Sequence, residues 1–247
     1  MKVAVFTQIY NEPLSNIRRY LTSISFQTFK DFDLYVIDDG STLPTYTYFE
    51  EVQKTITKPK IHVVKLEHKG YFRGWYLLRD KYDIVGKIDG DVFFNPSAIE
   101  EVLKRFDSKV GIVYGNIVNE ESSFGAFMFV RSKILRKIKP YYVLLTYGDS
   151  YLYHKTRELG YKIVRCEEAK VFHLRKIKMT IKRKVKEGFA MYSLGYYLPF
   201  VKDPIKLVGY LAALLKGFKL DEDLANFLKR LQVNSLRKRM YKFVGFS

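Results

Sequence analysis

The sequence has little cysteine, no long hydrophobic run and too few acidic residues to balance its basic ones. The single cysteine, Cys166, excludes an internal disulfide and is compatible with a reducing compartment. No run approaches the roughly 18 apolar residues that a membrane-spanning helix needs. The apolar stretch near the start, Val3 to Phe6, is too short for a secretory leader. We therefore expect neither a leader nor a transmembrane helix.

Two common nucleotide-binding fingerprints are also missing. Neither GxGxxG nor GxxxxGK[ST] occurs, so neither a dinucleotide-binding motif nor a P-loop accounts for a nucleotide site. Apolar residues make up 47% of the 247 residues, which excludes a disordered chain. This length fits one large domain, or one domain with an appendage.

Charge is distributed unevenly along the chain. The 43 Lys and Arg residues exceed the 26 Asp and Glu residues, giving a net charge of +17. The segment 170–247 holds 18 of the basic residues and 5 of the acidic ones, a net +13, which leaves +4 for residues 1–169. This asymmetry indicates an anionic partner for the last third, either nucleic acid or a membrane surface.

The first 119 residues alternate between strand-like and helix-like patterns. Apolar runs predict strands at residues 2–7, 34–37, 61–66, 84–88 and 111–119. Helical spacing and start signals predict helices at about 13–27, 44–54, 70–82 and 95–106. Such alternation predicts an α/β fold with parallel strands and helices on both faces.

Carboxylates follow two of these predicted strands. Asp38 and Asp39 come after the second strand, and Asp89 and Asp91 come after the fourth. The carboxyl ends of parallel strands share one edge, so these acids and the loop with Tyr10 should converge. Two carboxylates two residues apart can share a hard cation, which suits a diphosphate. Asp-Gly-Asp is also an ordinary turn sequence, and by itself it does not distinguish the two.

Several segments in order resemble the family 2 glycosyltransferases of GT-A fold. The matching segments are Val3–Asn11, Gln27-Thr28-Phe29, Ile37-Asp38-Asp39-Gly40-Ser41 and Asp89-Gly90-Asp91. Of the family's Ala-Arg-Asn only Arg73 is kept, and Gln8-Ile9 stand where the family usually has Pro-Thr. The resemblance covers residues 1–175. It implies a GT-A fold, with a mixed sheet flanked by helices, and an inverting, nucleotide-sugar-dependent hexosyltransferase.

The resemblance also implies roles for individual residues. Asp39 and Arg73 would hold the nucleotide, and Asp89 would lie near the ribose or the metal. The implied donor-binding set is Gln8, Tyr10, Glu12, Asp39, Arg73 and Asp89. Asp91 and His173 would ligate Mg²⁺ or Mn²⁺ on the diphosphate. A lone histidine on an apolar strand is more often a core or surface residue, so the role of His173 depends on the resemblance.

The segment 147–160 resembles the family's Glu-Asp-x-Asp-Leu…Arg…Gly motif. Asp149 aligns with the second acid, whereas Gly148 and Tyr151 stand where the family has two other acids. The resemblance implies that Asp149 is the general base. An acid at the start of a helix is favoured by the helix dipole. A plain helix cap is the commoner role of such an aspartate when it is considered alone.

These patterns predict a GT-A catalytic domain at 1–174 and a basic helical extension at 175–247. The domain would comprise a nucleotide-binding half, 1–119, and an acceptor half, 120–174. The aromatic segment 123–130 lies beside the sugar by resemblance, or forms a core strand. A strand at 162–165 and a closing strand at 171–173 would complete the acceptor half.

The basic extension is expected to form helices at about 174–186, 205–218 and 221–240. Ile177, Ile181 and Val185 repeat at helical spacing within a Lys- and Arg-rich stretch. Such helices suit a membrane interface, a cap on the sheet, or nucleic acid. We expect a cytoplasmic enzyme, peripheral at the inner face of the membrane, with a glycan or lipid-linked acceptor. The alternative is an inactive membrane-peripheral or nucleic-acid-binding protein on the same fold.

Overall fold

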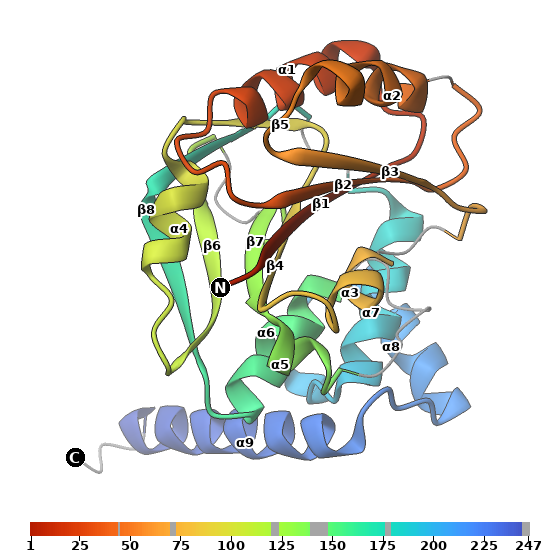
Figure 1. The fold of residues 1–247 in the computed structure, drawn as a ribbon. Helices are drawn as coiled ribbons and strands as arrows, with labels where there is room; N and C mark the ends of the chain where they lie inside the picture. Colours follow the sequence, from red (N-terminus) through yellow and green to blue (C-terminus); the bar gives the residue numbers. More distant parts are fainter. Residues whose placement is uncertain (44, 70–72, 120–123, 139–147, 176–178, 244–247) are drawn as a thin grey trace. The chain divides into compact units, whose positions relative to one another are not determined.

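The computed structural model contains two compact units (Figure 1). It describes residues 1–43, 45–69, 73–119, 124–138, 148–175 and 179–243. The first unit comprises Met1–Ile138 and Leu159–Lys176, and the second comprises Lys139–Glu158 and Ile177–Ser247. The predicted boundary at residue 174, between a catalytic domain and a basic extension, stays a prediction.

The first unit is built on a mixed sheet, as predicted. Its strands are β1 (Val3–Ile9), β2 (Asp33–Asp38), β3 (Lys60–Lys65), β4 (Ile84–Ile88), β5 (Val92–Phe94), β6 (Val110–Ile117), β7 (Phe127–Arg131) and β8 (Lys162–His173). Within the described residues their order is β3-β2-β1-β4-β7-β6-β8-β5. The first four strands run in parallel. β7 is antiparallel to β4 and β6, and β8 is parallel to β6 and antiparallel to β5.

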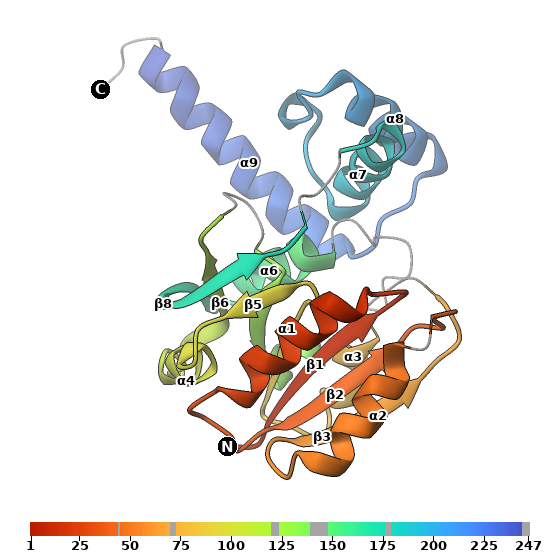
Figure 2. The same cartoon turned by 90° about the horizontal axis from the view of Figure 1, so that it is seen from above.

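Helices cover both faces of this sheet (Figures 1 and 2). They are α1 (Leu14–Ser25), α2 (Thr45–Thr55), α3 (Gly74–Leu78), α4 (Ala98–Lys104) and α5 (Ser132–Leu135). The helices α1 and α2 lie over one face of β1 to β3, and α3 packs on the other. Ile17, Tyr20 and Ile24 form the buried stripe of α1 that their spacing predicts. The core between these layers fixes where each strand ends.

Two strand predictions were wrong at their boundaries. The first strand extends beyond Thr7 to Ile9, because Ile9 still pairs with Asp38 of β2. The strands predicted at 162–165 and 171–173 are one strand, β8, whose pairing with β6 shifts register after Cys166. Residues 124–126 precede β7, and Ser123 lies outside the described residues. Because Phe127 and Phe129 are buried in the core, the segment forms a core strand.

Two helix predictions in this unit were also wrong. The helix expected at 70–82 is only α3, and residues 70–72 lie outside the described part. Among the described residues of this segment, Trp75 and Leu78 are the buried large apolar side chains, and both lie on this short helix. Asn95 does not cap the next helix, which begins at Ala98. Its side chain instead accepts a hydrogen bond from the Lys170 backbone N–H, 2.9 Å away, and so fastens this loop to β8.

The second unit is helical. It contains α6 (Gly148–Glu158), α7 (Ile181–Leu194), a 3₁₀ turn (Leu198–Phe200), α8 (Pro204–Lys216) and α9 (Glu222–Phe243). The helix predicted at 174–186 starts later, at Ile181, where the Thr180 hydroxyl accepts from the backbone N–H of Arg183. It continues to Leu194 because Ala190, Met191 and Leu194 supply its buried face. Ile177 lies outside the described residues.

The helices α7 and α8 approach each other through two glycines. A Cβ atom on Gly188 would overlap the carbonyl oxygen of Lys206, and one on Gly209 would overlap the carbonyl oxygen of Val185. Beside this contact the buried Glu187 pairs with Lys206 at 2.8 Å. The packing of this helix pair therefore requires the absence of side chains at both positions.

Substituting Gly209 tests this close approach. On an exposed helix Gly→Ala stabilises by about 1 kcal/mol, whereas overpacking costs about 1–3 kcal/mol. We expect Gly209→Ala to lower the free energy of unfolding in urea by about 1–3 kcal/mol. Leu215→Ala, on the exposed side of α8, is the control and should change it little. A stabilised Gly209→Ala protein would contradict the packing of α7 on α8.

Candidate active site

The loops after β1 and β2 are tied together at the carboxyl edge of the sheet. Asn11 has a left-handed backbone (φ 49°), and its side-chain oxygen accepts from the N–H groups of Thr42 (2.8 Å) and Leu43 (3.1 Å). The buried Asp38 folds back and accepts from the N–H of Ser41 at 3.0 Å. These bonds bring the two loops together as the sequence predicts. Asp38 therefore supports the loop. The neighbouring acid, Asp39, contacts the side chains of Arg73 and His68.

Asp39 is the centre of a polar corner. Its carboxylate contacts Nη2 of Arg73 at 2.6 Å and Nδ1 of His68 at 3.0 Å. The ring of His68 stacks on Tyr10, with centroids 4.1 Å apart and planes 23° from parallel. Gln8 accepts from the Arg73 backbone N–H at 2.9 Å. Four predicted donor-binding residues, together with His68, therefore lie in one place.

A second cluster lies at the end of β4. Asp89, Asp91 and His173 each offer a ligand atom, and these atoms lie within 4.8 Å of one another. Nε2 of His173 is 3.4 Å from Oδ1 of Asp91. The antiparallel pairing of β5 with β8 sets Val92 opposite His173, which brings the histidine to the loop of Asp91. The structure thus brings the two predicted metal ligands together.

Arg175 lies against the same cluster. Its guanidinium contacts Asp91 Oδ2 at 2.7 Å and Glu12 Oε2 at 2.8 Å. Burial raises the pKa of Glu12. Burial also acts to raise the pKa of Asp91, but hydrogen bonds and charge from His173 and Arg175 outweigh it and lower that pKa to about 2. Asp91 is therefore held as a carboxylate.

Asp89 forms an ion pair with a buried lysine of β4. Nζ of the buried Lys87 lies 2.9 Å from Asp89 Oδ1 and donates to the carbonyl oxygen of Gly125 at 2.9 Å. This ion pair orients Asp89 and offsets its charge. Sequence reasoning missed Lys87, His68 and Arg175. A lysine inside the apolar strand, two residues before Asp89, was a usable signal for the first.

The cluster fits a divalent cation. Carboxylate oxygens are the ligands that Mg²⁺ and Mn²⁺ prefer, and imidazole nitrogen is also acceptable to Mn²⁺. Asp91 and His173 face each other at a distance that one ion can bridge, with Asp89 in reach. Arg175 is the complication, because it contacts one of the same carboxylates.

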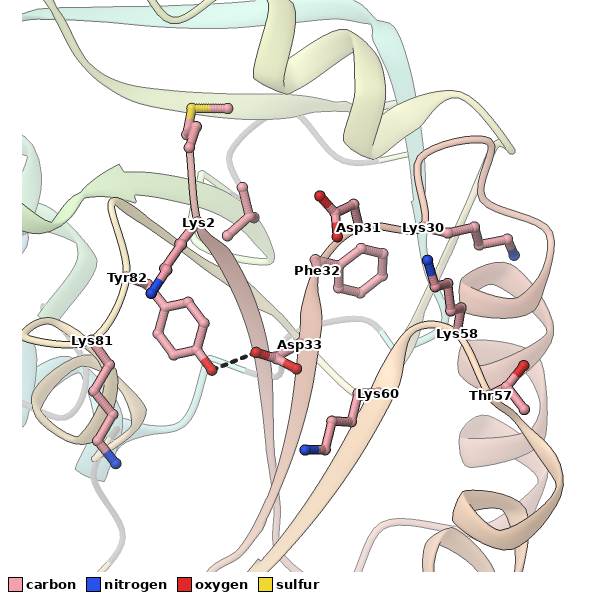
Figure 3. Close-up of a pocket in the computed structure, with 12 residues that line it drawn as sticks. Lys2, Lys30, Asp31, Phe32, Asp33, Thr57, Lys58, Lys60, Lys81 and Tyr82 are labelled. Atoms are coloured by element: carbon pink, nitrogen blue, oxygen red, sulfur yellow. Dashed lines mark hydrogen bonds between the residues drawn. The ribbon is translucent and has the colours of Figure 1, made fainter.

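A cavity in the first unit lies at the amino ends of β1 to β3 (Figure 3). It has a volume of about 400 Å³. Five lysines line it: Lys2, Lys30, Lys58, Lys60 and Lys81. Tyr82 donates to Asp33 there at 2.6 Å. This cavity is separate from the acidic clusters, because those clusters lie at the opposite, carboxyl ends of the strands, where ligands of such sheets bind.

Asp149 lies in the second unit, in the first turn of α6. The same helix is anchored by Tyr151, whose buried hydroxyl donates to Asp221 at 3.1 Å, and by Lys155, which pairs with Asp221 at 3.0 Å. Tyr147 lies outside the described residues. The role of Asp149 as a general base stays a prediction.

Comparison with known proteins identifies the family. The family model described as Glycosyl transferase family 2 matches residues 4–164. Hyaluronan synthase from Streptococcus pyogenes is 28% identical over 114 residues, which cover 44% of this chain and 27% of that protein. The match therefore spans just over a quarter of the length of that relative.

Solved structures share the fold. The mannosyltransferase PcManGT from Pyrobaculum calidifontis, in complex with GDP-Man and Mn²⁺, has a TM-score of 0.64 at 16% identity, covering 87% of this chain and 69% of its own. TarS 1–349 from S. aureus, in complex with UDP-GlcNAc, has a TM-score of 0.61 at 17% identity, covering 78% and 66%. The chain has the GT-A fold and belongs to glycosyl transferase family 2.

Proposed function

We propose that this protein is an inverting glycosyltransferase that moves a hexose-type sugar from a nucleoside diphosphate to an acceptor hydroxyl. The observation that carries the proposal is the cluster of Asp89, Asp91 and His173 beside the Asp39 corner, at the carboxyl edge of a family 2 sheet. Similar structures with GDP-Man and with UDP-GlcNAc support a nucleotide-sugar donor.

The Asp39 corner would bind the nucleoside. Asp39, which Arg73 and His68 hold in place, would accept from an N–H of the base. The exposed ring of Tyr10, stacked on His68, offers a face on which a base can stack. Asp89, oriented by Lys87, would accept from a ribose hydroxyl or reach the cation.

The second cluster would hold the diphosphate through Mg²⁺ or Mn²⁺. Asp91 and His173 are the proposed ligands, with Asp89 in reach. A cation bound there would neutralise the charge that develops on the leaving diphosphate. The low pKa of Asp91 keeps its carboxylate ionised at neutral pH, as a ligand must be.

Asp149 is the proposed base. It would take the proton of the acceptor hydroxyl as that oxygen forms a bond to the anomeric carbon. The bond from this carbon to the diphosphate oxygen breaks with its electron pair on the leaving group. Attack opposite the leaving group inverts the anomeric centre, and the step requires no covalent intermediate with the enzyme.

Asp91→Asn tests the metal site. The amide keeps the shape of the side chain but removes the charge that a divalent cation needs. We expect Mn²⁺ affinity, measured with UDP or GDP present, to fall by at least the roughly 10–100-fold that even indirect changes at metal sites cause. Asp80→Asn is the matched control, since Asp80 also pairs with an arginine, Arg136, but precedes β4, whereas the cluster follows that strand. Equal Mn²⁺ affinity in all three proteins would refute the assignment.

Asp149→Asn tests the general base. Loss of a general base should lower the rate of transfer, or of donor hydrolysis with water as acceptor, by about 10²-fold or more. Donor affinity should remain unchanged. The assay follows release of nucleoside diphosphate from UDP-GlcNAc, GDP-Man and other common nucleotide sugars.

The matched control for this variant is Asp223→Asn. Asp223 lies in the first turn of α9, so the control also removes one acid from a helix start in the second unit. A near-native rate for Asp149→Asn would exclude Asp149 as the base. An equal loss in both variants would show that helix stability, rather than proton transfer, explains the effect.

We also propose that residues 175–247 form a basic extension that docks the enzyme on an anionic membrane, at its inner face. The helix α8 exposes an apolar face comprising Val208, Leu211, Leu214 and Leu215, with Leu215 89% exposed, and Phe218 is exposed just beyond its end. Lys216 and Lys202 are exposed near its two ends, which complements an anionic surface. In the described part of the chain no helix has both the length and the hydropathy of a bilayer span.

The α8 face predicts salt-sensitive binding to vesicles. Each basic residue near an anionic surface contributes about 1 kcal/mol, and this term is screened by salt, whereas the buried apolar face leaves a salt-resistant remainder. We expect co-sedimentation with phosphatidylglycerol vesicles and little with phosphatidylcholine. Leu211→Asp with Leu215→Asp should abolish the salt-resistant part.

Leu43→Asp, an exposed leucine in the first unit, is the control and should leave vesicle binding intact. Equal binding to neutral and anionic vesicles would contradict the electrostatic part. Binding to duplex DNA with none to vesicles would instead support a nucleic-acid partner.

A further inference from the structure

Arg175 contacts Asp91, the carboxylate that the proposed cation would also need. Its guanidinium bridges two buried carboxylates, Asp91 and Glu12, at 2.7 and 2.8 Å. Glu12 is fixed from its other side by Asn16, which donates at 2.7 Å. The Arg175 side chain is itself 56% exposed, so its carboxylate partners are enclosed while it is largely in solvent. The arginine can therefore leave without unpacking the core.

A guanidinium and a divalent cation on the same carboxylate oppose each other. Both are positive, and the buried setting of Asp91 screens their repulsion less than water would. Removing the arginine without a substitute would leave Asp91 and Glu12 facing each other as two acids. A divalent ion can replace the arginine as the counter-charge, and the freed guanidinium then needs an anionic partner.

A diphosphate is such a partner. Arginine binds phosphate oxygens through paired hydrogen bonds that are stronger than those between neutral groups. Arg175 lies two residues after His173, just beyond the end of β8, and both side chains contact Asp91. The arginine therefore belongs to the site that would hold the donor's diphosphate.

We propose that Arg175 is a positioning residue that occupies Asp91 until the donor arrives. It neutralises Asp91 and Glu12 in the free protein, and it turns to the diphosphate when cation and donor bind together. The inference rests on the proposed function and adds an order to it: cation and nucleoside diphosphate bind with positive coupling. Such coupling is reciprocal, so each should tighten the other by the same factor.

Mn²⁺ binding to the full chain tests this without catalysis. The free Mn²⁺ signal in electron paramagnetic resonance gives the affinity with and without UDP or GDP. We expect Arg175→Gln to bind Mn²⁺ alone on the order of tenfold more tightly than the unaltered protein. The factor by which the nucleotide tightens Mn²⁺ should be smaller in this variant. Arg175→Lys keeps the charge and should retain weak Mn²⁺ binding.

Arg165→Gln is the matched control. Arg165 lies on β8, ten residues before Arg175, is similarly exposed and pairs with Glu167 at 3.1 Å. It should leave the affinity for Mn²⁺ and its coupling to nucleotide unchanged. Arg175→Gln with Mn²⁺ affinity equal to or weaker than that of the control would overturn the proposal. So would the absence of Mn²⁺ binding in every protein.

The outcomes separate this inference from the proposed function. Release of nucleoside diphosphate from a nucleotide sugar, with Mn²⁺ affinity unaffected by Arg175→Gln, supports the transferase and refutes the arginine's role. Tighter Mn²⁺ binding in Arg175→Gln, with no nucleotide sugar cleaved, supports the arginine's role and refutes the transferase.

Discussion

The crowding of buried carboxylates at one edge of the sheet is the constraint on which the site depends. Asp91 and Glu12 repel each other, and this repulsion helps raise the pKa of Glu12. Isolated buried charges are too costly to persist, so positive groups must lie within contact distance. Lys87, from one part of the chain, and His173 and Arg175, from a second, meet that need. The same need explains why a divalent cation suits this place.

The sheet topology supplies these partners. Parallel pairing of β1 with β2 and β4 brings three strand ends to one edge, which gathers the acids and Glu12. The antiparallel contact of β5 with β8 then returns a segment from far along the chain, carrying His173 and Arg175. A site built in this way forms only after distant strands have paired. Its geometry therefore reflects the folded unit and not any local segment.

This dependence decides what could be predicted from the sequence. The acids at strand ends could be identified, because Asp39, Asp89 and Asp91 follow apolar runs at recognisable spacing. Arg175 could not, since its role arises from the pairing of β5 with β8 and from a partner, Glu12, in another loop. The start of α7 was missed for another reason: a cap at Thr180 sets it, and not the first basic residues of the segment.

The second unit shows a contrasting use of the same physics. Burial acts to raise the pKa of Asp221, but hydrogen bonds from the Leu224 backbone N–H, Lys155 and Tyr151 outweigh it and lower that pKa. Lys155 is itself buried and also pairs with Glu158 at 2.6 Å, so these enclosed ion pairs act as an anchor for α6. Arg175 differs because its far side is open to solvent. An enclosed cation fixes structure, whereas an open one can be exchanged for a metal ion. By this criterion Tyr151 and Lys155 belong to the anchor of α6, whereas Asp149, in the first turn of the same helix, remains the base that we propose.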